Sequence, residues 1–150
     1  MKHLKATSFT CVSKLVTNEN LHLPLETLFR FGCIFHRPAE SSWPYKNIKA
    51  TRLHENREVK PGDYLRIHTD PRFYPEADRI DWNDRIVERT EEFVILNKPS
   101  GVPSHSTSDN GVQNCLYAMK LHLGVTCWLP HRLDTDTSGI LVAALTILQQ

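Results

Sequence analysis

The sequence has few cysteines and no long apolar run, and each shortage excludes a class of protein. No stretch approaches the ~20 consecutive apolar residues that a membrane-spanning helix needs, so we do not expect a membrane protein. The four cysteines in 150 residues are widely spaced and form no CxxC pair, unlike those of a disulfide-rich secreted scaffold. We therefore expect reduced thiols in an intracellular compartment, whether cytoplasm, nucleus or an organelle such as a chloroplast or mitochondrion.

Groupings of residues with metal-ligand spacing are also scarce. The one metal-like grouping is Cys115, His122, Cys127 and His131, and its spacing matches no common zinc pattern. Cys115 also falls on the apolar face of a predicted helix. We expect no metal site.

The first residues lack acids and arginine. No acidic residue precedes Glu19 and no arginine precedes Arg30, while lysines and hydroxyl residues are frequent. Low acidity suits an organellar transit peptide, but such peptides usually favour arginine. We expect residues 1–22 to be an unstructured terminus or the remnant of a targeting segment.

The formal net charge of +1 hides an uneven distribution along the chain. Residues 36–72 contain eight Lys/Arg against five Asp/Glu, whereas residues 73–101 contain four against seven. The sign changes just after a proline-bracketed stretch at 71–75, where composition also shifts. We therefore place a domain boundary near residue 75, with one domain at 23–74 and a second at 75–150.

The first domain is predicted to contain a short helix and several strands. Residues 23–38 read as a helix that stops at Gly32 and passes into a strand, and a polar stretch follows at 39–47. After a turn at Pro61 and Gly62, polarity alternates along residues 64–68. Tyr64, Arg66 and His68 would then share an outward face, which suits a nucleic acid or is simply a solvated strand face. Arg57, Lys60 and Arg66 are the cations that we expect to contact a nucleic acid here.

The second domain is predicted to alternate strands with one helix. Residues 85–89 and 93–97 read as strands, and the second should stop at Lys98–Pro99 because proline donates no ladder hydrogen bond. A loop at 97–105 leads to an amphipathic helix at 109–124, with Met119 in the core and Gly124 at its end. An apolar strand follows at 140–145.

A conspicuous acidic side chain precedes that last strand, in the run HRLDTDTSG at 131–139. Asp134 stands close to Arg132 and is followed by Thr137, Ser138 and Gly139. A carboxylate held against an apolar strand is costly if it is buried, because a buried charge must be paired. This arrangement favours a functional role for Asp134.

Two motifs together indicate a family. HRLDTDTSGILV, preceded by VILNKPSGVPSH, resembles the first part of the catalytic domain of the RluA-type RNA pseudouridine synthases, over roughly residues 85–145. Residues 25–68 resemble, more loosely, the small RNA-binding module named after a ribosomal small-subunit protein that often precedes that domain. The resemblance implies an α+β fold: a small αβ RNA-binding module followed by the start of a mixed, mainly antiparallel catalytic sheet.

The resemblance also implies a reaction. Asp134 falls on the family's essential aspartate, in an enzyme that detaches uracil from ribose, rotates the base and rejoins it through carbon five, without metal or organic cofactor. The carboxylate could attack the sugar covalently or act as a base at the ribose. The expected partner is RNA, whether ribosomal, transfer or messenger RNA, and the protein is expected to be a monomer.

The neighbouring motif residues have implied roles as well. Arg132 matches an arginine that contacts RNA near the flipped nucleotide, with a salt bridge to Asp134 or Asp136 as the alternative. His131 is expected to be packed or hydrogen-bonded, and Lys98 to be architectural or to reach a phosphate. The three residues Thr137, Ser138 and Gly139 are expected to shape the turn, the hydroxyls by capping backbone donors and the glycine by allowing close approach.

The family's catalytic domain continues well beyond this point, with a later tyrosine and a later basic residue. We therefore expect the chain to be a fragment, a truncated isoform or an incomplete gene model, weakly active or inactive alone. A catalytically silent RNA-binding protein is the second hypothesis. An unrelated hydrolase using Asp134 as its nucleophile is the third, although no GxSxG, HExxH or phosphate-binding glycine loop supports it.

Overall fold

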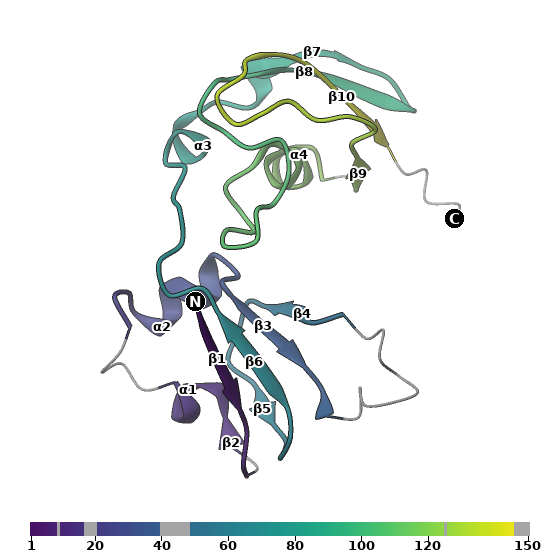
Figure 1. Ribbon diagram of the computed structural model, residues 1–150. Helices are drawn as coiled ribbons and strands as arrows, with labels where there is room; N and C mark the ends of the chain where they lie inside the picture. Colours follow the sequence, from purple (N-terminus) through teal and green to yellow (C-terminus); the bar gives the residue numbers. More distant parts are fainter. Residues whose placement is uncertain (9, 17–20, 40–48, 125, 146–150) are drawn as a thin grey trace. The chain divides into compact units, whose positions relative to one another are not determined.

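The structure is a computed structural model that describes residues 1–8, 10–16, 21–39, 49–124 and 126–145. Apart from Ala39, the polar stretch at 39–47 lies outside the described residues. The chain forms two compact units, Met1–Arg72 and Phe73–Gln150 (Figure 1). Among the described residues, none of the helices has the length and apolar character that a membrane span requires.

The first unit is built on an antiparallel four-stranded sheet in the order β1-β6-β3-β4. These strands are β1 (Lys2–Lys5), β3 (Ile34–Arg37), β4 (Thr51–Leu53) and β6 (Tyr64–Ile67). Two short strands, β2 (Thr10–Cys11) and β5 (Glu58–Val59), pair separately. The helices are α1 (Val12–Leu15) and α2 (Leu25–Arg30).

The sequence pattern explains the core of this unit. The predicted helix and strand at 23–38 are confirmed as α2 and β3, joined through Gly32, whose φ of 63° is one that glycine adopts without strain. The predicted alternation in β6 is also confirmed, because Leu65 and Ile67 are fully buried while Tyr64 and Arg66 are only partly buried. One face of the sheet therefore packs on the core.

The N-terminus differs from expectation. An unstructured terminus is wrong for Lys2–Lys5, which forms edge strand β1 and pairs with β6 in a regular register. The strand continues into a buried Ala6, whose N–H donates to the Asp63 carbonyl (2.8 Å) and whose carbonyl accepts from Gly62 N–H (2.7 Å). Pairing with β6 satisfies backbone groups that a free terminus would leave to water.

The second unit is built on an antiparallel sheet in the order β7-β8-β10-β9. Its strands are β7 (Ile86–Arg89), β8 (Phe93–Lys98), β9 (Cys127–Trp128) and β10 (Gly139–Leu145). The helical segments are α3 (Glu76–Arg79), a 3₁₀ turn (Asn83–Arg85) and α4 (Cys115–Leu123). Val94, Leu96 and Leu141 from the sheet and Met119 from α4 share one buried cluster, so the α+β class and the core position of Met119 are confirmed.

Helix α4 is shorter than predicted. It begins at Cys115 rather than 109, because Asn114 is its N-cap and accepts a hydrogen bond from Tyr117 N–H (3.0 Å). Asn110 holds the preceding turn, where its side-chain oxygen accepts from Gln113 N–H (3.1 Å). Asparagine side chains compete with the helical pattern of backbone bonds, which the apolar spacing did not reveal. Gly124 ends the helix as predicted, with φ 65°.

Candidate active site

The loop at residues 131–139, hereafter the 131–139 loop, leads into β10 and presents Asp134 to solvent. The N–H of Thr137 donates to the Asp134 carbonyl (3.1 Å), which closes a turn directly after the acid. Gly139 then starts β10 with φ 136°, a conformation that L side chains rarely adopt. An added Cβ at Gly139 would meet no atom closer than 3.9 Å, so backbone conformation, and not the expected close approach, requires this glycine.

A second segment, residues 98–104, lies beside this loop. Gly101 N–H donates to the Thr135 carbonyl (2.9 Å), and the Ser100 hydroxyl donates to the Asp136 carbonyl (2.8 Å). Antiparallel pairing of β8 with β10 brings the two segments together, with Lys98 opposite Gly139. The two sequence motifs therefore form one structural unit.

Lys98 is the innermost part of that unit. Its side chain has no exposed surface, and its ammonium donates to the carbonyls of Pro99 (3.0 Å), Thr135 (2.9 Å) and Thr137 (2.6 Å). Burial lowers the pKa of this ammonium, although nearby acidic groups, among them Asp136 and Asp134, act to raise it. The idea that Lys98 reaches a phosphate is thus corrected: its donors are used to hold the turn after Asp134.

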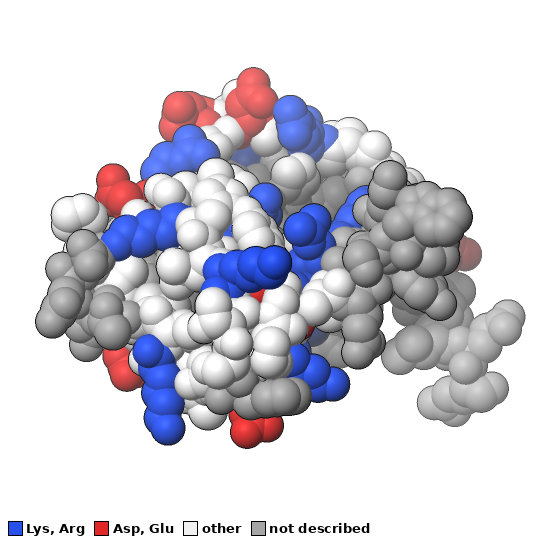
Figure 2. Space-filling view, turned by 60° about the horizontal axis from the view of Figure 1, so that its bottom comes forward, with Lys and Arg blue, Asp and Glu red and all other residues white. Residues whose placement is uncertain are grey.

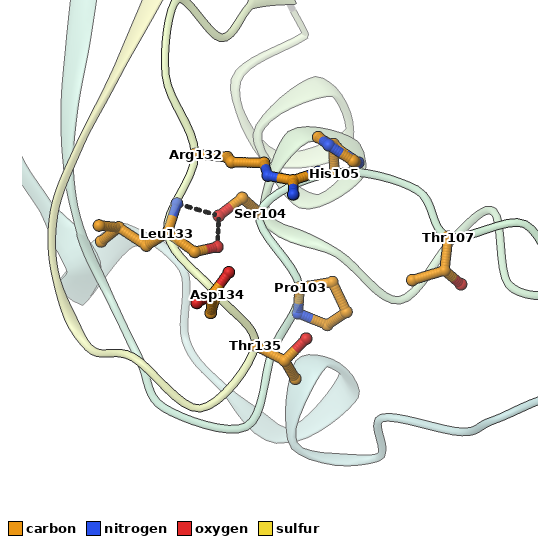
Figure 3. A pocket seen from close by; sticks show the side chains of 8 residues that line it. All are labelled: Pro103, Ser104, His105, Thr107, Arg132, Leu133, Asp134 and Thr135. Carbon is orange, nitrogen blue, oxygen red and sulfur yellow. Dashed lines mark hydrogen bonds between the residues drawn. The ribbon is translucent and has the colours of Figure 1, made fainter.

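Ser104 holds the other side of the acid. Its hydroxyl donates to the Leu133 carbonyl (2.7 Å) and accepts from Leu133 N–H (3.0 Å), so both polar backbone groups of the residue before Asp134 are fixed (Figure 3). Sequence reasoning missed Ser104, although it lies in the VPSH run of the upstream motif. Asp134 is thus held by backbone contacts on both sides.

A hollow of ≈ 190 Å³ opens at this point. It is lined by Pro103, Ser104, His105, Thr107, Arg132, Leu133, Asp134 and Thr135 (Figure 3). In that view the Arg132 side chain extends toward His105. Ser104 lies between Arg132 and Asp134. His105, like Ser104, was not anticipated from the sequence. The hollow therefore has a carboxylate on one part of its wall and cationic or ring side chains on another.

The charges differ from expectation in two ways. Asp134 is exposed, so the argument that it is a costly buried charge is wrong, and its backbone supports distinguish it instead. Within the described residues Arg132 joins no ion pair with Asp134 or Asp136, which removes the salt-bridge alternative there. Both side chains are open to a ligand.

His131 is hydrogen-bonded at the start of the loop. Its Nε2 accepts from Val142 N–H in β10 (3.0 Å), which places the ring proton on Nδ1 in the neutral form. β9 pairs with Ala144 and Leu145 of β10. Val142 lies before these two residues, and its N–H donates to His131 instead of to a strand. Thr137 contributes through its backbone N–H, and Ser138 is exposed beside it.

Neither the cysteines nor the remaining candidate cations line the hollow beside Asp134. Burial raises the pKa of the Cys115 thiol to about 12, so the thiol stays protonated and is unreactive as a nucleophile. Among the described residues no group of three or more His, Cys, Asp or Glu is placed to hold a metal ion. In the first unit, Arg57 and Lys60 line a hollow of ≈ 380 Å³ that also contains Asp63, whereas Arg66 lines a different one of ≈ 430 Å³. The structure thus divides these predicted cations between two surfaces.

Comparison with known proteins is consistent with the motifs. Residues 92–147, which contain the 98–104 segment and the 131–139 loop, match the family model described as RNA pseudouridylate synthase. The chloroplastic RNA pseudouridine synthase 6 of Arabidopsis thaliana is 37% identical over 95 residues, which cover 62% of this chain and 20% of that protein. The ribosomal large subunit pseudouridine synthase C of Buchnera aphidicola (subsp. Baizongia pistaciae) is 34% identical over 114 residues, covering 65% and 34%.

A third relative is more distant. The ribosomal large subunit pseudouridine synthase D of Neisseria meningitidis serogroup A is 29% identical over 99 residues, which cover 59% of this chain and 25% of that protein. The chain therefore matches between 20% and 34% of the length of these relatives.

Proposed function

The chain belongs to the RluA-type RNA pseudouridine synthase family, and from this premise we propose that it isomerises uridine to pseudouridine in RNA with Asp134 as the catalytic carboxylate. The observation that carries the proposal is an exposed carboxylate in a hollow, fixed by Ser104 on one side and by Lys98 on the other. Rigid positioning of one reactive group is what such a reaction requires, because misplacement by about 1 Å can cost about a hundredfold in rate.

The proposed reaction conserves atoms and electrons. The bond from uracil N1 to the ribose breaks, a bond from C5 to the ribose forms, the C5 proton leaves and N1 gains a proton. No external oxidant or reductant takes part. The Asp134 carboxylate can attack the sugar to form an ester that breaks when the C5 bond forms, or it can remove a proton from the ribose and return it when that bond forms. Its exposure in the hollow suits either route.

Arg132 is proposed to hold the RNA while the target base is out of the stack. Extruding a base costs a few kcal/mol, and a planar cation can fill the vacated space or pair with a phosphate. Arg132 is exposed, joins no ion pair in the described part of the chain, and lines the same hollow as Asp134. Ser104 and Lys98 are positioning residues, because they reach Asp134 only through its neighbours' backbone.

Large-subunit ribosomal RNA is the first substrate to test. Two of the relatives above are ribosomal large subunit pseudouridine synthases by name, and we propose the same class of RNA for this chain. Transfer and messenger RNA transcripts serve as comparison substrates. We propose an intracellular location, since one relative is chloroplastic and others come from bacteria.

Tritium release from C5-labelled uridine in RNA tests the role of Asp134. Asp134→Asn is expected to reduce release by about a thousandfold, because it removes the nucleophile or base and retains the side-chain shape. Asp136→Asn is the matched control: it makes the same change two residues later, at an exposed acid, and should stay within about twofold of the parent. Equal release by the parent and Asp134→Asn would remove Asp134 from the mechanism.

A catalytically silent RNA-binding protein is the second candidate. The basic first unit favours it, with twelve Lys/Arg against seven Asp/Glu in residues 1–72. No tritium release from any substrate, together with intact salt-sensitive RNA binding, would select this candidate over the enzyme.

A further inference from the structure

Two rows of side chains cross the outward face of the first unit's sheet. The strand register places His3 of β1, Arg66 of β6, Phe35 of β3 and Arg52 of β4 in one row. A second row contains Lys5, Tyr64 and Arg37. These two described rows contain rings and cations and no Asp or Glu.

The opposite face of the same strands is the core. Ile34, Leu53, Leu65 and Ile67 have at most 5% exposure, and the buried His36 lies on this face too, so buried and outward residues alternate along β3 and β6. On the outward face His3 and Arg37 are exposed, while Phe35, Tyr64 and Arg66 are partly buried. The outward face is thus accessible to a ligand across the width of the sheet.

Planar groups on this face pack against one another. The Arg66 guanidinium lies 4.4 Å from the Phe35 ring centroid, and that of Arg37 lies 5.0 Å from the Tyr64 centroid. The His3 and Tyr64 rings are 5.4 Å apart at their centroids. Among the described residues no hydrogen-bond acceptor meets Arg66 Nε, although that atom is buried. Such contacts orient guanidinium planes and rings as surfaces on which bases can stack.

The same groups surround a hollow of ≈ 430 Å³ lined by His3, Arg37, Lys49, Ala50, Tyr64 and Arg66. Lysine and arginine side chains, blue in Figure 2, are spread over much of the face in view, and acidic side chains lie mostly toward its margins. Like charges on neighbouring strands repel one another, so a bound polyanion would stabilise this arrangement. We call His3, Phe35, Arg37, Lys49, Tyr64 and Arg66 the basic sheet face.

We propose that the basic sheet face binds single-stranded RNA, with bases stacked on Tyr64 and on the Arg66 guanidinium and with phosphates paired to Arg37 and Lys49. A duplex hides the faces of its bases and offers mainly phosphates, whereas a single strand offers both. The inference rests on the proposed function in that RNA is the substrate. The face would hold an unpaired segment of that substrate.

Binding of a fluorescent single-stranded oligouridylate of about 12 nucleotides to the full chain tests the proposal, since small single-strand sites cover about 4–16 nucleotides. Replacing both Arg37→Gln and Arg66→Gln is expected to weaken binding at least about tenfold and to lower the salt slope by about 0.7, because Arg37 pairs with a phosphate whereas Arg66 stacks on a base. The matched control replaces Arg57→Gln and Lys60→Gln, which removes the same charge from the other hollow of the unit and should change affinity less than about twofold. Equal weakening by the two double variants would overturn the proposal.

Two further variants separate stacking from charge. Tyr64→Leu and Arg66→Lys retain the charge of the face but remove a ring or a plane, and each should weaken oligouridylate binding about tenfold while leaving heparin binding within about twofold. Tighter binding of a matched RNA duplex, or unchanged oligouridylate binding by both variants, would leave only an electrostatic patch and overturn the stacking site. Circular dichroism and thermal unfolding show that each variant is folded. The catalytic proposal fails if the parent and Asp134→Asn release tritium equally, whereas this proposal fails on oligouridylate binding by the sheet-face variants, so the two failures are distinguishable.

Discussion

Lys98 is a buried cation whose contacts are made entirely with backbone carbonyls. Three carbonyl oxygens surround its ammonium, two of them on the 131–139 loop. Taking an ammonium out of water is expensive unless its donors are all used, and an ammonium has three. The geometry meets this condition, which explains why a lysine can occupy the centre of the unit that positions Asp134.

Lys98→Met is predicted to destabilise the second unit by about 2–4 kcal/mol, because three carbonyls lose a charged donor while the side chain keeps its length. Pseudouridine formation should fall as well, since the turn after Asp134 loses its main support. Urea unfolding and tritium release measure the two effects. Lys120→Met, at an exposed position of α4, should leave both unchanged, and an equally stable Lys98→Met protein would refute the assigned role.

Asp63 holds the turn before β6 in a comparable way. Its carboxylate accepts from His36 Nε2 (2.8 Å), Ala39 N–H (2.8 Å) and Lys60 N–H (3.0 Å), and it is only 4% exposed. Burial raises the pKa of Asp63, but the hydrogen bonds from Lys60, His36 and Ala39 outweigh that effect and leave the pKa lowered. The charged form is therefore favoured by folding.

A lowered folded-state pKa makes stability depend on acid in a defined direction. The contribution of Asp63 is complete above the unfolded pKa of about 3.9 and is lost as pH falls through the lower folded value. Asp63→Asn is predicted to cost about 1–3 kcal/mol at pH 7, with a difference from the parent that shrinks below about pH 4. Chemical unfolding at a series of pH values tests this, with exposed Asp70→Asn as the control that should follow the parent throughout.

Residue-level reasoning from the sequence selected Asp134 for a reason that the structure does not support. Proximity to an apolar strand suggested a buried charge, but the acid lies on a turn and is exposed. Sequence proximity says little about the direction of a loop side chain. The paired motifs were the better signal, because β8 and β10 bring the 98–104 segment into contact with the 131–139 loop.

At the scale of elements, alternating polarity and glycine positions predicted strands and helix ends correctly. The short strand β1 and the capped start of α4 were not predicted. Strands β6 and β8 follow from period-two burial and from Lys98–Pro99, and the ends of α2 and α4 follow from helix-terminal glycines. β1 has a single apolar residue, Leu4, between His3 and Lys5, so its sequence shows no apolar alternation. The late start of α4 depends on asparagine side-chain bonds that apolar spacing does not encode.

The most informative element for the site is the 98–104 segment. Ser104→Ala is predicted to cost about 1–2 kcal/mol of stability, because Leu133 loses both hydrogen bonds to the serine hydroxyl. The turnover number should fall more than the Michaelis constant rises, since the serine positions Asp134 without being needed to bind RNA. Kinetics of tritium release measure this split.

Ser100→Ala is the control for that experiment. Its hydroxyl also donates to a loop carbonyl, that of Asp136, but Ser100 is exposed and the bond lies two residues beyond Asp134. Loss of this exposed bond should cost at most about 0.5 kcal/mol. If Ser100→Ala and Ser104→Ala reduce turnover equally, the position of the Ser104 bond beside Asp134 has no special importance.

At the scale of the whole molecule, charge is divided between the two units. Residues 1–72 contain twelve Lys/Arg and seven Asp/Glu, whereas residues 73–150 contain six and ten. The hollow with Asp134 is therefore part of an acidic unit, which repels RNA at long range. We therefore propose that the basic unit supplies most of the attraction for RNA, a division that the net charge of +1 conceals.

This division predicts how RNA affinity responds to salt. The logarithm of the binding constant should fall linearly with the logarithm of salt concentration, with a slope of about 0.7 for each single-strand phosphate neutralised. Replacing Glu91→Gln and Glu92→Gln in the acidic unit should tighten binding less than about threefold, because exposed distant charges are largely screened. These replacements should leave the slope unchanged, since they alter no cation that contacts a phosphate.

Arg132→Gln completes this salt experiment. As one of six cations in the acidic unit, Arg132 should account for at most one phosphate contact, so its removal should lower the slope by about 0.7 and leave the remainder to the basic unit. Fluorescence anisotropy with single-stranded RNA between about 50 and 200 mM salt, the range over which such contacts change affinity strongly, gives all three slopes. A slope near zero in Arg132→Gln would instead locate the electrostatic attraction at the catalytic hollow. The charge difference between the units would then have no part in RNA capture.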